Sequence, residues 1–135
     1  MKVLFVAGFG PIVRDGEAAG ALYRRTLGLP GFKEEDGDYW HTESLEGVRS
    51  FGLWPLPQAA ESCFGSPDWP ADLPVPQAWL EFDVEDLAAA TEELRAAGHR
   101  VLVDNRLEPW GQSVSRFLSP EGVLVGLTVT PWLRA

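Results

Sequence analysis

The chain has 135 residues, of which 45% are hydrophobic and 11% aromatic, a composition that excludes a disordered polypeptide and fits one folded domain. Its formal charge of −9 disfavours binding to nucleic acids or to anionic membranes, because both require clustered basic side chains. The single cysteine, Cys63, excludes an internal disulfide and a cysteine-rich metal site. The apolar N-terminal run is too short to cross a bilayer, so we expect a cytoplasmic protein.

The first half of the chain carries signals for a strand, a helix and further strands. Residues 3–13 form an apolar, extended run that predicts the first strand. Apolar residues then recur at steps of three and four over residues 15–27, which predicts a helix with Asp15 as its N-cap and Gly28 as its left-handed C-cap. Strand patterns follow over residues 38–43 and 48–54.

Residues 55–77 differ in composition from the segments on either side. They contain prolines 55, 57, 67, 70, 74 and 76, out of 11 in the chain. Proline removes a backbone donor and fixes φ, so this stretch predicts a connector with little regular structure.

The second half repeats the order of the first. Residues 78–84 predict a strand, and residues 87–97 predict a helix with Asp86 as its N-cap and Gly98 at its end. Strand patterns follow over residues 100–103, 113–118 and 124–130. Short turns join most consecutive strands, which disfavours a parallel α/β sheet and predicts an α+β fold of two tandem βαβββ modules.

Several short motifs in this order resemble the vicinal oxygen chelate superfamily, which includes glyoxalase I, extradiol dioxygenases and bleomycin-resistance proteins. The matching residues span almost the whole chain: Val13-Arg14-Asp15, Tyr23, Leu27-Gly28-Leu29, Phe82 to Leu87, Ala96-Ala97-Gly98, Pro109-Trp110-Gly111 and Ser119-Pro120-Glu121-Gly122. The resemblance implies one domain whose two modules, about 1–54 and about 78–135, form half-barrels around a concave groove. It also implies a homodimer.

The same resemblance bears on metal binding. Metal-dependent members of the superfamily use four side chains on the first and last strands of each module. The corresponding positions here are Gly8, Gly52, Trp79 and Gly126, and none of these residues can coordinate a divalent ion. We therefore expect no metal and no other cofactor, which places the chain closest in character to the bleomycin-resistance-like branch.

A groove without a metal would be aromatic and acidic. Alternation along residues 79–83 directs Trp79, Glu81 and Asp83 into the groove and places Leu80 and Phe82 under the second helix. Indole rings stack on planar ligands and attract cations, and carboxylates pair with them. The predicted ligand-binding residues are Trp79, Glu81, Trp110, Trp54, Trp40 and Asp83. Trp132 is interpreted as covering a core edge or a dimer seam.

Three functional hypotheses follow. The leading one is a metal-independent small-molecule binding protein of the glyoxalase/bleomycin resistance type, with no catalytic residue, whose ligand is planar or cationic and includes antibiotics that it would sequester. The alternative is a metal-dependent lyase, isomerase or dioxygenase of the same superfamily, with Glu81 as a ligand or base. The third is an interaction module whose pocket has been lost.

Overall fold

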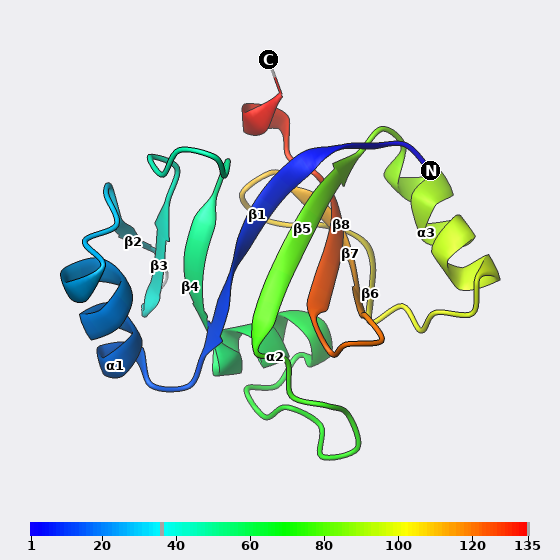
Figure 1. Ribbon diagram of the computed structural model, residues 1–135. Helices are drawn as coiled ribbons and strands as arrows, with labels where there is room; N and C mark the ends of the chain where they lie inside the picture. Colours follow the sequence, from blue (N-terminus) through cyan, green and yellow to red (C-terminus); the bar gives the residue numbers. More distant parts are fainter. Residues whose placement is uncertain (36, 135) are drawn as a thin grey trace.

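A computed structural model of the protein describes residues 1–35 and 37–134. Its centre is a sheet of eight strands in the order β2-β3-β4-β1-β5-β8-β7-β6 (Figure 1). The strands are β1 (Val3–Val13), β2 (Lys33–Glu35), β3 (Tyr39–Thr42), β4 (Phe51–Pro55), β5 (Ala78–Val84), β6 (Val103–Leu107), β7 (Ser113–Leu118) and β8 (Leu124–Val129). The helices are α1 (Gly16–Gly20) with its π-helical continuation η1 (Ala21–Thr26), α2 (Leu56–Phe64), α3 (Leu87–Ala96) and the 3-10 turn η2 (Pro131–Leu133).

The sheet consists of two similar halves joined at its middle. Strands β1 and β5 pair antiparallel, with Phe9 opposite Leu80, and each also pairs in parallel with the last strand of its own half, β4 or β8. Each half has the order βαβββ, so the predicted α+β fold of two tandem modules is confirmed.

Helices α1 and α3 pack on the same face of the sheet, which we call the outer face. Both begin as predicted, because the carboxylates of Asp15 and Asp86 accept hydrogen bonds from backbone N–H groups three residues later, each at 3.0 Å. Leu94 of α3 is buried against the sheet, with Phe82 packed beside it. The opposite face of the sheet, which carries neither α1 nor α3, is called the inner face.

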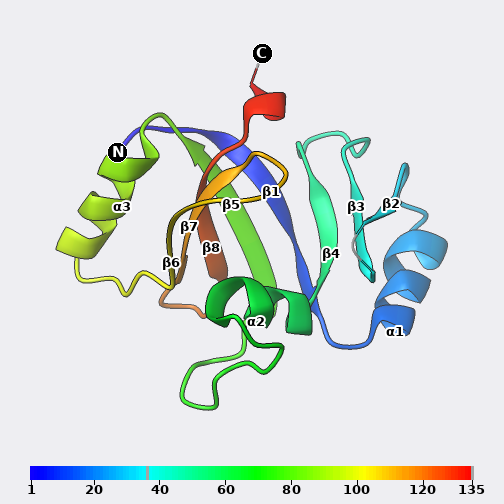
Figure 2. The same ribbon diagram turned by 180° about the vertical axis from the view of Figure 1, so that it is seen from behind.

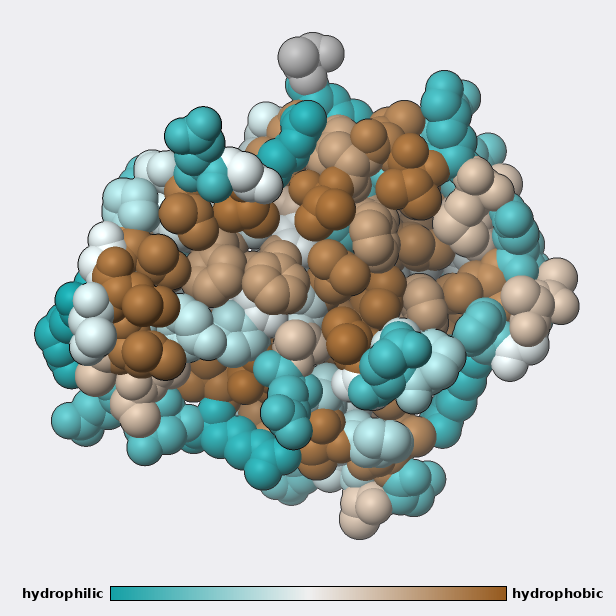
Figure 3. All heavy atoms as spheres, viewed as in Figure 1, coloured by the Kyte–Doolittle hydropathy of each residue, from teal (hydrophilic) through white to brown (hydrophobic). Residues whose placement is uncertain are grey.

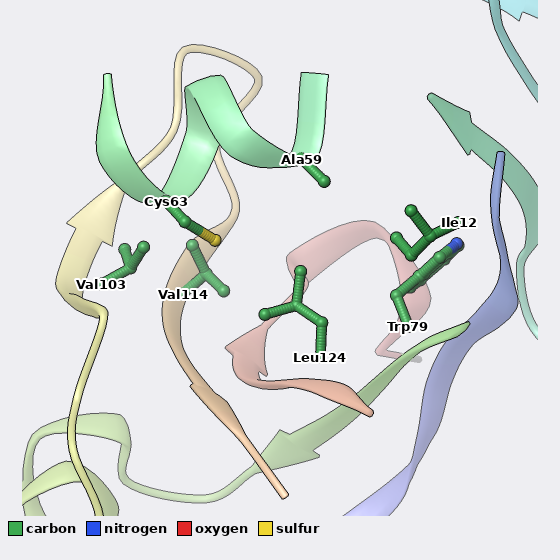
Figure 4. Packing of buried hydrophobic residues seen from close by; sticks show 7 residues of the cluster. All are labelled: Ile12, Ala59, Cys63, Trp79, Val103, Val114 and Leu124. Carbon is green, nitrogen blue, oxygen red and sulfur yellow. The ribbon is translucent and has the colours of Figure 1, made fainter. Parts of the chain in front are cut away.

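The predicted irregular connector contains a helix, so the expectation of little regular structure was wrong over residues 56–64. Pro57 lies in the first turn of α2, where a missing N–H costs no helical hydrogen bond, and Gly65 ends the helix with φ +73°. Ala59 and Cys63 point from α2 onto the inner face, toward the cluster that contains Trp79 (Figure 4). Cys63 is buried in this cluster and acts as a core residue, and this burial raises the pKa of its thiol.

Two strands differ from their sequence patterns. Residues 33–35 form an edge strand although Lys33 and its two neighbouring glutamates carry no hydrophobic alternation. The strand predicted at residues 100–103 begins instead at Val103 and continues to Leu107, with an irregular register around Asn105, whose φ is +46°. Across the described residues, no helix is long and apolar enough to cross a membrane.

Candidate functional site

The inner face encloses a cavity of about 780 Å³. Figure 2 views the molecule from behind, with α2 in front of one end of the sheet. The lining comes from both halves, from α2 and from the C-terminal segment: Ala7, Glu35, Tyr39, His41, Glu43, Ser50, Trp54, Gln58, Glu61, Ser62, Trp79, Glu81, Arg106, Glu108, Trp110, Gln112, Arg116, Thr130, Trp132 and Leu133.

Trp79 forms part of the cavity wall, and its ring packs directly against the backbone of Gly8 and Gly52. A Cβ atom on Gly8 would lie 2.7 Å from the Cζ3 atom of this indole, and one on Gly52 would lie 3.2 Å from its Cζ2 atom. The indole N–H donates to the carbonyl of Gly52 at 3.2 Å, and Trp54 meets the ring edge-on with centroids 6.0 Å apart. Because Trp79 is only 3% exposed, it gives the cavity shape and offers a ligand little stacking area.

A buried ion pair crosses the second half of the inner face. Nη1 of Arg116 lies 3.1 Å from Oε2 of Glu81, and their side chains are 4% and 11% exposed. Gln112 donates to Oε1 of Glu81 at 3.2 Å and to the hydroxyl of Thr130 at 2.9 Å, while it accepts from the Trp110 indole N–H at 3.1 Å. These bonds fix the orientation of the Glu81 carboxylate.

Glycine also makes the space for this ion pair. Glu81 and Arg116 flank Gly126 in the sheet register, one on each neighbouring strand. A Cβ atom on Gly126 would lie 3.0 Å from Cγ of Glu81 and 3.4 Å from Nη1 of Arg116. The two long side chains can therefore meet across the strand that separates them.

Tyr39 and His41 are two of the lining residues that the first half contributes. Their rings stack with centroids 5.2 Å apart, and Nε2 of His41 lies 3.2 Å from a carboxylate oxygen of Glu35. Burial, followed by the negative charge of Glu81, raises the pKa of the Tyr39 hydroxyl above its ordinary range. This hydroxyl stays protonated at neutral pH and can donate a hydrogen bond.

The exposed lining residues Glu43, Glu61, Trp110 and Trp132, which we call the mouth of the cavity, are acidic or aromatic. The exposed carboxylates of Glu43 and Glu61 form no ion pair within the described chain, whereas Glu108 is paired with Arg106 at 3.1 Å. Two exposed indoles, Trp110 at 55% and Trp132 at 51%, also line the cavity. The interpretation of Trp132 as a core-edge or seam residue was therefore incomplete, because the C-terminal segment brings it to the site.

The predicted ligand-binding residues divide into two groups. Trp54, Trp79, Glu81 and Trp110 all line the cavity, whereas Trp40 and Asp83 do not. Trp40 packs with the outer-face cluster, under the Arg24 guanidinium at 3.5 Å from the ring centroid.

Asp83 is directed toward the inner face as expected, but it is fully buried and holds the C-terminal segment in place. It accepts from the Thr130 N–H and from Nε of Arg134, both at 2.9 Å, and also from the hydroxyl of Thr128. Its position next to the segment that carries Trp132 makes it a supporting residue for the cavity wall.

Several residues that line the cavity were not predicted from the sequence. Tyr39 and His41 lie two apart on β3, and Arg116 lies between the apolar residues Val114 and Leu118 on the inner-face side of β7. A charged residue at an apolar alternation position was the available signal for Arg116. Glu61 and Ser62 had no such signal, because they depend on a helix in a proline-rich stretch.

The side chains at the site do not fit a divalent metal ion. The four positions singled out in the sequence are three glycines and the buried indole of Trp79, none of which has a side chain that can coordinate a metal. Among the residues that the structure describes, no three His, Cys, Asp or Glu side chains gather in a group that could hold a metal.

The fold and its inner-face cavity agree with the family to which this chain is related. The Glyoxalase/Bleomycin resistance protein/Dioxygenase superfamily matches residues 9–127, and the chain belongs to this superfamily. A comparison with curated proteins finds no match.

Solved structures show the same fold in proteins of diverse description. A superfamily member from Vibrio splendidus 12B01 matches with a TM-score of 0.60 at 16% identity, over 93% of this chain and 97% of that one. Methylmalonyl-CoA epimerase from Streptomyces coelicolor, an E43L variant in complex with 2-nitronate-propionyl-CoA, matches with a TM-score of 0.60 at 18% identity, over 99% of both chains. A protein described as an NAD-dependent benzaldehyde dehydrogenase from Legionella pneumophila matches with a TM-score of 0.58 at 12% identity, over 90% of this chain and 96% of that one. At these identities the likeness concerns the fold alone.

Proposed function

We propose that the protein is a metal-independent small-molecule binding protein whose inner-face cavity takes a planar, cationic ligand, and that sequestration of an antibiotic of this kind is its role. The observation that carries the proposal is the composition of the exposed part of the cavity lining, which includes the carboxylates of Glu43 and Glu61 and the indoles of Trp110 and Trp132. Aromatic faces attract organic cations, and the attraction increases when the site is desolvated.

The charges around the cavity favour a cation over an anion. Glu35, Glu43, Glu61, Glu81 and Glu108 line it, against two arginines, 106 and 116, which are each paired with a glutamate. The remaining negative charge lies at the mouth, where it attracts a cation during approach. A highly anionic ligand such as the CoA ester bound by the epimerase would meet this charge unfavourably.

The size of the cavity suits a small organic molecule. Ligand sites commonly enclose about 300–1,000 Å³ and are lined by aromatic side chains with a few polar groups. The volume of about 780 Å³ and the five aromatic side chains in the lining, Tyr39, Trp54, Trp79, Trp110 and Trp132, meet that description.

A metal-dependent lyase, isomerase or dioxygenase is the alternative within the superfamily. The donor set does not support it, because the Glu81 carboxylate, which lies beside Gly126, is paired with Arg116. Elemental analysis of gently purified protein tests the alternative. A full equivalent of zinc, nickel, manganese or iron would favour the enzyme and reject the proposal.

Binding is tested by titrating proflavine, a planar cation, into the protein at low ionic strength and following the heat released. We expect saturable one-site binding. The double substitution Glu43→Gln with Glu61→Gln should weaken it about two- to thirtyfold, because each of the two exposed ion pairs with the ligand contributes about 0.2–1 kcal/mol. The matched control is Glu46→Gln with Glu121→Gln, which removes the same charge from exposed positions outside the cavity. Equal loss in both double variants, or no binding by the wild type, would refute the proposal.

We also propose a homodimer, formed through the outer face of the central strands. Val3, Val6 and Phe9 of β1 are 48%, 43% and 45% exposed, and they lie opposite Val84, Phe82 and Leu80 of β5. Figure 3 shows an apolar area over the middle of this face. Adjacent exposed apolar side chains of this kind are typical of protein interfaces. A second copy placed on this face would leave the cavity on the opposite face open.

A further inference from the structure

We propose that the ligand carries an oxygen acceptor, a carbonyl or carboxylate, at the end opposite its positive charge, and that Arg116 receives this oxygen inside the cavity. The inference rests on the proposed function and specifies the ligand class of the same site. It follows from the hydrogen-bonding state of one buried guanidinium.

Arg116 is buried with unused donors. Its side chain lines the cavity and is 4% exposed, yet neither Nε nor Nη1 donates a hydrogen bond to any group in residues 1–35 and 37–134. The Nη1 atom is near Oε2 of Glu81, at 3.1 Å, which balances charge without a hydrogen bond of good geometry. Buried donors without partners are rare in native proteins because they lose their hydration without compensation.

Neighbouring side chains fix the position of this guanidinium and the orientation of the Glu81 carboxylate, so that the carboxylate cannot rotate to accept its hydrogen bonds. The Arg116 guanidinium lies over the Trp54 ring, with Cζ 4.7 Å from the centroid. Gln112 binds the other oxygen of Glu81, and Gln112 is itself anchored by Thr130 and Trp110. A carbonyl or carboxylate oxygen fits the arginine donors because guanidinium presents its N–H groups as a planar fork.

The buried and the exposed parts of the cavity lining therefore differ in the ligand groups that they favour. The buried part includes Arg116, which has unpaired N–H donors, and the mouth offers the unpaired carboxylates of Glu43 and Glu61. A ligand with an amine or amidine at one end and a carbonyl or carboxylate at the other matches both. A planar cation without an acceptor matches only the mouth.

Three probes separate these contributions: benzamidine, 4-amidinobenzamide and 4-amidinobenzoate share a planar cation and differ in the acceptor. Calorimetric titration should show the two acceptor-bearing probes binding about tenfold or more tightly than benzamidine, as expected for hydrogen bonds from a charged donor. In the Glu81→Gln, Arg116→Gln double variant, which removes both charges together, this ratio should fall toward one. The control Arg100→Gln changes an exposed arginine outside the cavity and should keep the ratio.

A second readout follows Arg116 directly. In a ¹H–¹⁵N spectrum of the arginine side chains, the Nε–H signal of Arg116, assigned with Arg116→Lys, should shift with 4-amidinobenzamide and stay in place with benzamidine. Equal affinities for all three probes with an unmoved signal would overturn the inference and leave the proposed function standing. If none of the probes binds, the proposed function fails and this inference fails with it.

Discussion

Substitution of Gly8 by alanine tests whether the Trp79 indole packs so closely against Gly8 that it leaves no room for a side chain. The added Cβ would lie 2.7 and 2.8 Å from Cζ3 and Cη2 of that ring, whereas carbon atoms pack favourably at about 3.5–4.0 Å. The ring would have to move away, but Trp54 and the hydrogen bond to Gly52 hold it. We expect Gly8→Ala to lower the free energy of unfolding by about 1–3 kcal/mol, the usual cost of overpacking.

A double-mutant cycle identifies the cause of this loss. Urea unfolding followed by circular dichroism should show that Gly8→Ala becomes nearly neutral when Trp79→Leu has removed the ring, with a coupling energy of about 1–3 kcal/mol. The control Gly16→Ala, whose Cβ would meet nothing within 4 Å, should change stability by less than about 0.5 kcal/mol. Additive losses from Gly8→Ala and Trp79→Leu would refute the packing argument.

Three further predictions concern the C-terminal anchor, a tyrosine and the outer face. Asp83→Ala should cost about 3–5 kcal/mol in urea unfolding, because it leaves the partly buried Arg134 and the buried Thr130 N–H without their carboxylate, and an effect below 1 kcal/mol would contradict the anchoring role. Since the pKa of Tyr39 is raised above its ordinary value of 10.0, the folded protein keeps this proton while the unfolded chain loses it. The free energy of unfolding should therefore fall above pH 10, by at most about 1.4 kcal/mol per pH unit from this group, and Tyr39→Phe should remove that part of the slope. An identical slope in the variant would reject this assignment. Val6→Asp should convert a dimer into a monomer in light scattering coupled to gel filtration, and a wild-type protein that is monomeric at micromolar concentration would contradict the proposed interface.

The elements that the sequence predicted well are those with local signals. Aspartate is a preferred N-cap residue, and Asp86 caps the helix that follows it. Gly98 adopts the positive φ that commonly ends a helix. The helix between them could therefore be predicted without knowledge of tertiary contacts. The alternation along β5 likewise placed Trp79 and Glu81 on the inner face, because a strand directs successive side chains to opposite sides.

The residues that were not predicted depend on contacts between distant segments. Arg116 reaches Glu81 only because β8 lies between their strands and has glycine at position 126. The role of Asp83 depends on Arg134, which is 51 positions away in the chain. Neither relation can be derived from the periodicity of a single segment, because both require the strand register.

The most direct test of the proposed binding function is a crystal structure of the protein with proflavine bound, determined from protein whose metal content has been measured. We predict the dye inside the cavity, in contact with Trp110 or Trp132, with its charged ring system toward Glu43 and Glu61 and with no metal ion beside it. A divalent cation held by side chains of the inner face, or a dye bound only on the outer face, would contradict the account.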